Sequence, residues 1–176
     1  ERQDRRVLLE GNILENNWTD GLPIVLPTEK RVAAMLAHTS RKPDEIVGRM
    51  QATEFRVAWE YTVEKVAVNA VMAGARPEYF PVILALAASE ISARGSTSSS
   101  ASAMVVVNGP IRHEIKMNAG IGAMGPYNHA NATIGRTLRL VLLNCLDCRP
   151  GVLDKSTQGW PGKYSLCFAE DEAQSP

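Results

Sequence analysis

Residues 119–144, AGIGAMGPYNHANATIGRTLRLVLLN, join a glycine-rich loop to a long apolar run. The apolar residues of the run that recur at helical spacing are Ile134, Leu138, Val141 and Leu142. This spacing predicts a helix over 130–144. Upstream, residues 104–107 (MVVV) are apolar and mostly β-branched, and the following Asn-Gly-Pro is typical of a turn after a buried strand. The expected order is therefore strand, glycine-rich loop, helix.

The junction between this loop and its helix is a candidate binding site. Glycines permit close backbone approach, and the first turn of a helix leaves N–H groups that attract a carboxylate or phosphate. Here His129 is a candidate for proton exchange. The candidate substrate contacts are Asn118, Gly122, Gly125, Tyr127, Asn128 and Asn131. Alternatively, an Asn simply caps the helix and His129 is an exposed loop residue. No GxxxxGK[ST] phosphate loop occurs, and nucleotide binding is not expected.

The rest of the chain is expected to be mostly helical. Helices are predicted over 29–40, 42–50, 59–73 and 77–92, and a second strand over 164–169. Residues 18–32 are predicted to be an extended loop lying across other elements, and residues 93–103 (ARGSTSSSASA) a flexible linker or a substrate-contacting loop. The expected fold is α+β or α/β, a helix-rich single domain at 20–176 with a small sheet. Residues 1–19 are expected to be flexible or extended.

Composition excludes several classes of partner. Of 176 residues, 45% are hydrophobic and 22% charged, and the 19 basic and 19 acidic side chains balance. Binding to nucleic acid or to an anionic membrane is not expected, because both depend on an excess of positive charge that this chain lacks. No apolar run is long enough to span a membrane, and the N-terminal residues lack the apolar centre of a signal peptide. We therefore expect a soluble cytoplasmic protein.

Polar residues inside two apolar segments are further candidates. In 59–73, Thr62, Lys65 and Asn69 recur at helical spacing, as a solvated face or as the lining of a pocket. In a pocket, Lys65 would bind an anion or exchange protons, Glu64 would orient it and Asn69 would contact the substrate. Asn108 follows the strand at 104–107, where α/β proteins place ligand-contacting groups, although an Asn before Gly also makes turns.

The cysteines give weak signals. Cys145 and Cys148 form a CxxC, which is half of a zinc site, a redox dithiol or a pair of ordinary cysteines. Cys167 falls in the predicted strand at 164–169 and is expected in the core. No metal or other cofactor is assigned from the sequence.

Four long stretches resemble the region that accompanies the redox motif in the UGSC family, which is named for a selenocysteine-or-cysteine, Gly, Ser, Cys motif. They are DGLPIVLPTEKRVAAML (20–36), TVEKVAVNAVMAGARPEYFPVILA (62–85), VVVNGPIRHEIKMNAGIGAMGPYNHANATIGR (105–136) and STQGWPGKYSLCFAEDEAQSP (156–176). The chain itself contains no Cys-Gly-Ser-Cys. The resemblance thus implies a partner subunit that carries the reactive cysteines.

Three functions remain open from the sequence. The first is a subunit of a heteromeric enzyme acting on a small anionic organic molecule, an oxidoreductase or lyase whose partner supplies thiol chemistry. The second is a self-sufficient lyase or hydrolase that uses His129, Lys65 and a carboxylate, with or without a metal. The third is a noncatalytic stabilising subunit. We favour the first, because polar and glycine-rich residues gather in separate stretches flanked by apolar sequence.

Overall fold

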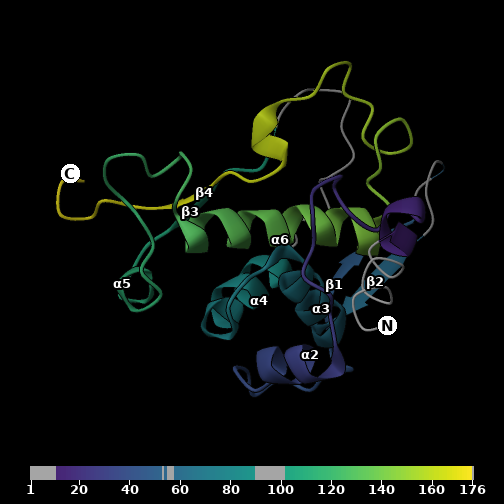
Figure 1. Ribbon diagram of the computed structural model, residues 1–176, viewed down its shortest axis with the longest axis horizontal. Coiled ribbons are helices and arrows are strands. Elements are labelled where there is room, and N and C mark those ends of the chain that lie inside the picture. The colour runs from purple at the N-terminus through teal and green to yellow at the C-terminus, as the bar shows by residue number, and fades with distance from the viewer. Residues whose placement is uncertain (1–10, 53, 55–57, 90–101, 176) are drawn as a thin grey trace.

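Helix α6 (His129–Leu146) runs through the middle of the molecule, and other elements pack along its sides (Figure 1). The computed structural model describes residues 11–52, 54, 58–89 and 102–175. Helices α3 and α4 pack on one side of α6, and strand β4 packs on another. This helix therefore joins a helical core to a small sheet.

The order of elements is irregular, with more helix than strand in the described chain. Besides α6 and the helical residues 11–15, the helical elements are α2 (Glu29–Leu36), α3 (Val63–Ala73), η1 (Pro77–Tyr79), α4 (Phe80–Ala88), α5 (Ile111–Glu114) and η3 (Pro161–Lys163). The strands are β1 (Ile46–Met50), β2 (Trp59–Thr62), β3 (Val105–Val107) and β4 (Cys167–Ala169). The first two strands pair antiparallel and the last two pair parallel. The predicted helix-rich α+β fold with a small sheet is confirmed.

Local sequence signals explain several helix ends. Thr28 and Thr62 cap α2 and α3, because each side chain accepts a hydrogen bond from the backbone N–H three residues later. Gly74 ends α3 in the left-handed conformation, with φ at 85°. Pro81 lies in the first turn of α4, where its missing N–H would have had no partner in the helix. The predicted helices beginning near residues 29 and 77 are thereby confirmed.

The antiparallel pair β1–β2 corrects two helix predictions. The sequence predicts a helix over 42–50 and another from residue 59, but strands occupy 46–50 and 59–62. A Cβ at Gly48 would overlap the Tyr61 hydroxyl group, so the pairing depends on glycine there. The Tyr61 hydroxyl donates to the carbonyl of Ala87 at 2.7 Å and ties the pair to the end of α4. A partner distant in sequence has overridden a weak local helix pattern.

The parallel pair β3–β4 confirms the predicted small sheet, although both strands are shorter than expected. Val105 pairs with Cys167 and Val107 with Ala169, and all four of these residues are buried. The side chains between them point the opposite way, since side chains alternate along a strand. Val106 is 42% exposed and Phe168 is half-buried. One face of the sheet is thus packed and the other is largely uncovered.

The stretch before α2 is bound to the helical core, which agrees with the predicted extended loop lying across other elements. The two carboxylate oxygens of Asp20 accept hydrogen bonds from Arg136 of α6 at 2.8 and 2.9 Å. The N–H of Val25 donates to the carbonyl of Met72 in α3 at 3.1 Å. Earlier in the chain, residues 11–15 are helical rather than extended. These contacts hold the stretch across both central helices.

Two sequence predictions fall partly outside the described residues. The N-terminal segment 1–19 is described only from residue 11, and the division of the chain at residue 19 stays a prediction. Most of the predicted linker at 93–103 also lies outside the described residues, which resume at residue 102. Among the helices of the described residues, none has both the length and the apolar character needed to span a membrane.

Candidate functional site

Asn131, in the first turn of α6, holds the glycine-rich loop against the helix. Its side-chain amide donates to the carbonyls of Asn118 at 2.9 Å and Ala123 at 3.0 Å, and its oxygen accepts from the N–H of Asn118 at 3.1 Å. The residue is 3% exposed, so these bonds satisfy a buried polar group. The predicted ligand contact is therefore engaged with the loop backbone.

The two other asparagines of the loop act on its backbone as well. The Asn128 amide donates to the carbonyl of Gly122 at 2.8 Å and lies within 3.3 Å of the carbonyls of Gly125 and Pro126. Asn118 donates to the Ile121 carbonyl at 3.0 Å, and its oxygen accepts from Gly120 N–H at 2.9 Å. Asn128 precedes α6 in an extended conformation without capping it through its side chain. The loop is thus fixed in shape by its own side chains.

An open cavity of about 530 Å³ lies between this loop and the uncovered face of β3–β4. Val106 and Phe168 line it from the sheet, and the loop lines it from Ala119 to Gly125. Glu170 and Asp171 line it just after β4, at the carboxyl ends of the parallel strands. Ligands of parallel α/β sheets bind outside these ends. The predicted contacts Gly122 and Gly125 are therefore at a cavity, and two carboxylates supply its charge.

Polar groups beyond the strand ends are linked to one another. Asn108, which follows β3, donates to Glu170 at 3.3 Å. Glu172 accepts a hydrogen bond from the N–H of Gly109 and forms an ion pair with Arg112 of α5, whose Nε lies 3.5 Å from Oε1. Arg112 is 9% exposed. Sequence reasoning identified Asn108 but missed Arg112 and Glu172, which are 60 residues apart and share no local pattern.

His129 lies at the start of α6 beside Tyr79. Its Nδ1 is 3.3 Å from the Tyr79 hydroxyl oxygen, and the two ring centroids are 5.8 Å apart. Partial burial lowers the pKa of His129, and the nearby charge of Arg76 lowers it further. The imidazole is therefore kept neutral near pH 7, the form that accepts a proton. The side chain of Tyr127, another predicted contact, is fully exposed.

Lys65 lies near the C-terminal end of α6, whereas His129 begins that helix. Asn69, one turn after Lys65 on α3, donates to the carbonyl of Lys65 at 2.8 Å and to the sulfur of Cys145 at 3.6 Å. Cys145 is 16 positions after His129 on α6, which corresponds to about 24 Å along the helix. The structure therefore does not bring the predicted catalytic residues His129 and Lys65 together, because they lie near opposite ends of α6.

The polar stripe on α3 divides into three different environments. Thr62 caps the helix, Lys65 and Glu64 are exposed, and Asn69 is buried. The Asn69 oxygen accepts from Asn144 of α6 at 2.7 Å, so this amide joins the two central helices. No ion pair links Glu64 to Lys65 in the described part of the chain. Asn69 is thus placed for packing and not at the cavity of the glycine-rich loop.

The three cysteines are buried. Burial raises the pKa of Cys145 to about 11 and that of Cys167 to about 12. Such thiols are poor nucleophiles at neutral pH, because the thiolate is the reactive form. Cys145 lies in the last turn of α6, and Cys148 follows the helix. Among the described residues, no three His, Cys, Asp or Glu side chains are grouped so that they could hold a metal ion.

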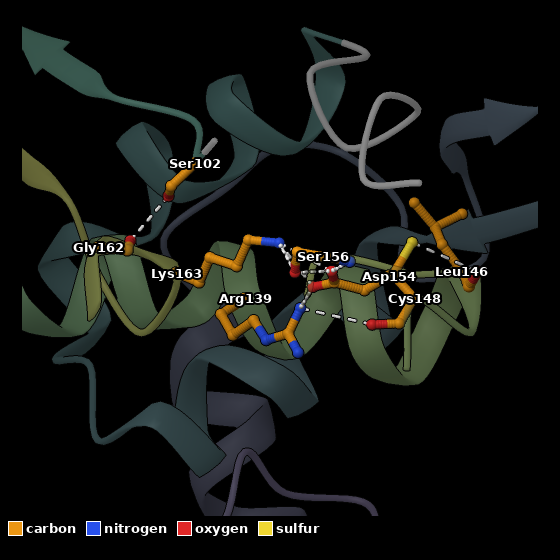
Figure 2. A network of polar contacts seen from close by, with 8 residues as sticks. All are labelled: Ser102, Arg139, Leu146, Cys148, Asp154, Ser156, Gly162 and Lys163. Atoms are coloured by element: carbon orange, nitrogen blue, oxygen red, sulfur yellow. Dashed lines mark hydrogen bonds and ion pairs between the residues drawn. The ribbon is translucent and has the colours of Figure 1, made fainter. Parts of the chain in front are cut away.

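A second polar cluster, which sequence reasoning missed, lies where the loop after α6 returns to the helix. Figure 2 shows Lys163 and Ser156 converging on Asp154. The Lys163 ammonium donates to both carboxylate oxygens at 2.8 and 2.9 Å, the Ser156 hydroxyl donates at 2.6 Å, and Arg139 of α6 lies 3.7 Å away. Burial alone would raise the pKa of Asp154, but the hydrogen bonds from Lys163 and Ser156 and the charge of Lys163 together outweigh it, and the pKa is lowered.

The donors of this cluster are directed at one buried carboxylate. Asp154 is 5% exposed, and the Ser156 hydroxyl gives its proton to that carboxylate while accepting from Lys163 at 2.9 Å. The ammonium, the hydroxyl and the carboxylate therefore satisfy one another. The cluster ties the loop 147–163 to Arg139 of α6.

The glycine-rich loop also presents large apolar side chains to solvent. Ile121 and Tyr127 are fully exposed and Met124 is 70% exposed. Because the loop is held by Asn118, Asn128 and Asn131, these side chains are displayed on a fixed backbone. A group of exposed apolar residues on one segment is typical of a protein interface or ligand-binding groove.

Comparison with protein-family models, with curated proteins and with solved structures gave no match to this chain. The resemblance to the UGSC family stays a prediction from the sequence. Function is therefore argued from the geometry of the cavity and of the surfaces around it.

Proposed function

We propose that this chain is one subunit of a heteromeric enzyme that binds a small organic molecule at the carboxyl ends of β3 and β4. The observation that carries the proposal is the cavity of about 530 Å³ between a fixed glycine-rich loop and those strand ends. Its volume is in the range of small-molecule sites, and its position is the one at which parallel sheets bind ligands. We expect the complex to be cytoplasmic and to act on a molecule that carries an anionic group.

The incomplete sheet supports a partner subunit. Parallel sheets are usually covered on both faces, whereas the outer face of β3–β4 is largely open. Val105 N–H bonds to the Leu166 carbonyl and Glu170 N–H to the Val107 carbonyl, which turns the N–H and C=O of Val106 toward the outer edge. The described chain adds no third strand there. A strand from a partner would complete the sheet and cover part of its exposed apolar surface.

The chemistry available to this chain supports a division of labour. Cys145 and Cys167 have raised pKa values, so a reaction that uses thiolates would draw them from the partner. The neutral imidazole of His129 is a proton acceptor near the same loop. The complex would be an oxidoreductase or lyase in which this chain binds the substrate and the second chain supplies the reactive thiols.

A second candidate is a noncatalytic stabilising subunit. One observation favours it: the amides of Asn118, Asn128 and Asn131 are spent on the backbone of the loop and not directed into the cavity. The loop would then be a rigid platform whose exposed Ile121 and Met124 hold a catalytic partner. Both candidates predict a stable heteromer, and they differ in whether this chain contacts the substrate.

Native mass spectrometry of the untagged protein purified from its own host tests the shared prediction. We expect a heteromer whose second chain carries a Cys-Gly-Ser-Cys or similar thiol motif. The double change Ile121→Asp with Met124→Asp should dissociate it, because charges would enter an apolar contact. The matched control is Val152→Asp, an exposed apolar residue on the loop 147–163. A homomer or monomer as the native form would refute the heteromeric function.

Substrate contact is tested in the same complex. Once turnover is assayed, Glu170→Gln and Asp171→Asn should change KM, because each removes a charge from the wall of the cavity that binds the substrate. Unchanged kinetics in both variants, with the complex intact, would favour the noncatalytic subunit.

A further inference from the structure

We propose that the N–H of Gly109 and the guanidinium of Arg112 form a carboxylate-binding site, which Glu172 of the same chain fills in the free subunit. The ligand class is a small organic acid, and its role as a substrate rests on the function proposed above. In this reading, the side-chain carboxylate of Glu172 stands in for the carboxylate of the ligand. The site lies beyond the carboxyl end of β3.

The donors converge from two elements that follow β3. Gly109, in the turn after the strand, donates its N–H to Oε1 of Glu172. Arg112, in α5, places Nε 3.5 Å from the same oxygen and donates from Nη2 to Oε2 at 3.5 Å. One backbone N–H and two guanidinium nitrogens thus address the two oxygens of one carboxylate. This donor set suits a planar anion with two acceptor atoms.

The occupancy by Glu172 is incomplete. Both contacts with Arg112 are 3.5 Å long, whereas ion-paired hydrogen bonds of this kind are usually about 2.7–2.9 Å. The Nε of Arg112 is buried and has no hydrogen-bond partner. A buried guanidinium N–H without a partner is costly, so the geometry leaves a donor for a better-placed acceptor. A free carboxylate, which is not tethered to the backbone, would reach both nitrogens in the two-pronged arrangement.

The side chain of Glu172 can be displaced from this site by a ligand. Its side chain is 40% exposed, and among the described residues its polar contacts are with Gly109 and Arg112. The Gly109 N–H, together with the charges of Arg112 and His113, holds the pKa of Glu172 below its ordinary value, which indicates surroundings that favour an ionised carboxylate. The same surroundings would favour the ionised carboxylate of a ligand.

The neighbouring cavity extends the ligand class. Glu170 and Asp171, the two residues before Glu172, line that cavity. A ligand whose carboxylate replaces Glu172 would carry its other end toward these two carboxylates, which accept hydrogen bonds. The fitting molecules are small carboxylic acids that also bear a hydroxyl or ammonium group. This agrees with the anionic substrate expected from the sequence and adds a requirement for a donor.

The test is a titration of the isolated ¹⁵N-labelled chain with sodium acetate at constant ionic strength, followed through the amide signal of Gly109. In Glu172→Gln the signal should shift and saturate, with a higher apparent affinity than in the unaltered chain, because the tethered carboxylate no longer competes with acetate. Glu114→Gln is the matched control: it removes the same charge from α5, and its response should equal that of the unaltered chain.

Arg112 is tested on the same background. Arg112→Gln with Glu172→Gln should abolish saturation, and Arg112→Lys with Glu172→Gln, which keeps the charge and spares the fold, should weaken it. No saturable shift in Glu172→Gln, or equal affinity in the Arg112→Lys double variant, would overturn the carboxylate site. Glycolate should bind more tightly than acetate, and equal affinity would remove Glu170 and Asp171 from the ligand site.

This titration needs no partner chain, so its failure is distinct from failure of the proposed function. Saturable acetate binding by a protein that purifies as a homomer would refute the heteromeric enzyme alone. An intact heteromer whose chain shows no acetate response would refute the carboxylate site alone.

Discussion

The two sides of α6 differ in how completely they are built. Toward α3 and α4 the helix meets a closed apolar core, in which Val66, Phe80 and Ile134 have no exposed surface. Toward β4 it meets a two-stranded parallel sheet in which Val106 is exposed and one edge is paired by no other strand of the described residues. The closed side supplies the stability, and the open side leaves backbone and apolar groups available for binding. This combination of a closed core and an open sheet is what we expect of a subunit that folds by itself and binds a partner through the sheet.

The largest expected effect is a difference in unfolding free energy between two matched truncations, one on each side of α6. Ile134→Ala should lower the free energy of unfolding by about 2–5 kcal/mol, because it leaves a cavity in the closed core. Val106→Ala should cost less than about 1 kcal/mol, since the side chain is already 42% exposed. Urea unfolding measures both. An equal cost at the two positions would mean that the open face is covered in solution.

The contact between α6 and β4 gives the next effect. A Cβ at Gly135 would overlap the Ser165 hydroxyl and lie 3.2 Å from the backbone nitrogen of Leu166. Gly135→Ala should therefore destabilise the protein by about 1–3 kcal/mol from overpacking, less about 1 kcal/mol gained in helix propensity. Gly120→Ala is the control, because its Cβ would meet only the Asn118 side chain at 3.8 Å. Thermal unfolding in which Gly135→Ala is the more stable variant would contradict the close packing of helix and strand.

The rigidity of the glycine-rich loop is tested by removing its two clamps in turn. Asn131→Asp keeps an acceptor for Asn118 N–H but loses both donated bonds, so stability should fall by about 1–3 kcal/mol and amide exchange should accelerate in 118–125. Asn128→Asp should do less, because that side chain is half-buried. Hydrogen exchange compares the variants. Unchanged protection in Asn131→Asp would show that the loop is held by other contacts.

The smallest effect is a pH dependence at the start of α6. Burial lowers the pKa of His129 below the value of about 6.5 expected for the unfolded chain. The unfolded state therefore binds more protons as the pH falls through that value, and the fold loses stability there. His129→Gln should flatten the difference in unfolding free energy between pH 8 and pH 5.5. A steeper loss of stability in that variant would reverse the sign assigned to this imidazole.

Much of the fold was predictable because its signals are local. Thr28, Thr62 and Gly74 set helix ends through bonds within a few residues. The strand that became β3 and the helix that became α6 were readable from β-branched residues and helical spacing. The strand at 46–50 was not, because its pattern is ambiguous and the pairing with β2 decided it.

The candidate site was predictable only in part. The sequence directed attention to the glycine-rich loop, and the cavity is there. It did not reveal that the Asn131 amide would be used by the loop itself, or that Arg112 would meet Glu172. It also paired His129 with Lys65, which the length of α6 keeps apart. Residue type shows which chemistry a side chain offers, but not which neighbour will use it.

The amino-acid sequence by itself determined the helix-rich class, the capped helices and the order of strand, glycine-rich loop and helix. These features depend on the spacing of apolar residues and on backbone preferences that act over one or two turns. The tertiary structure alone decided the β1–β2 pair, the Asp154 cluster and the meeting of Glu172 with Arg112. Those contacts join residues through packing across α6 or pairing between strands, and their partners carry no mark in the local sequence.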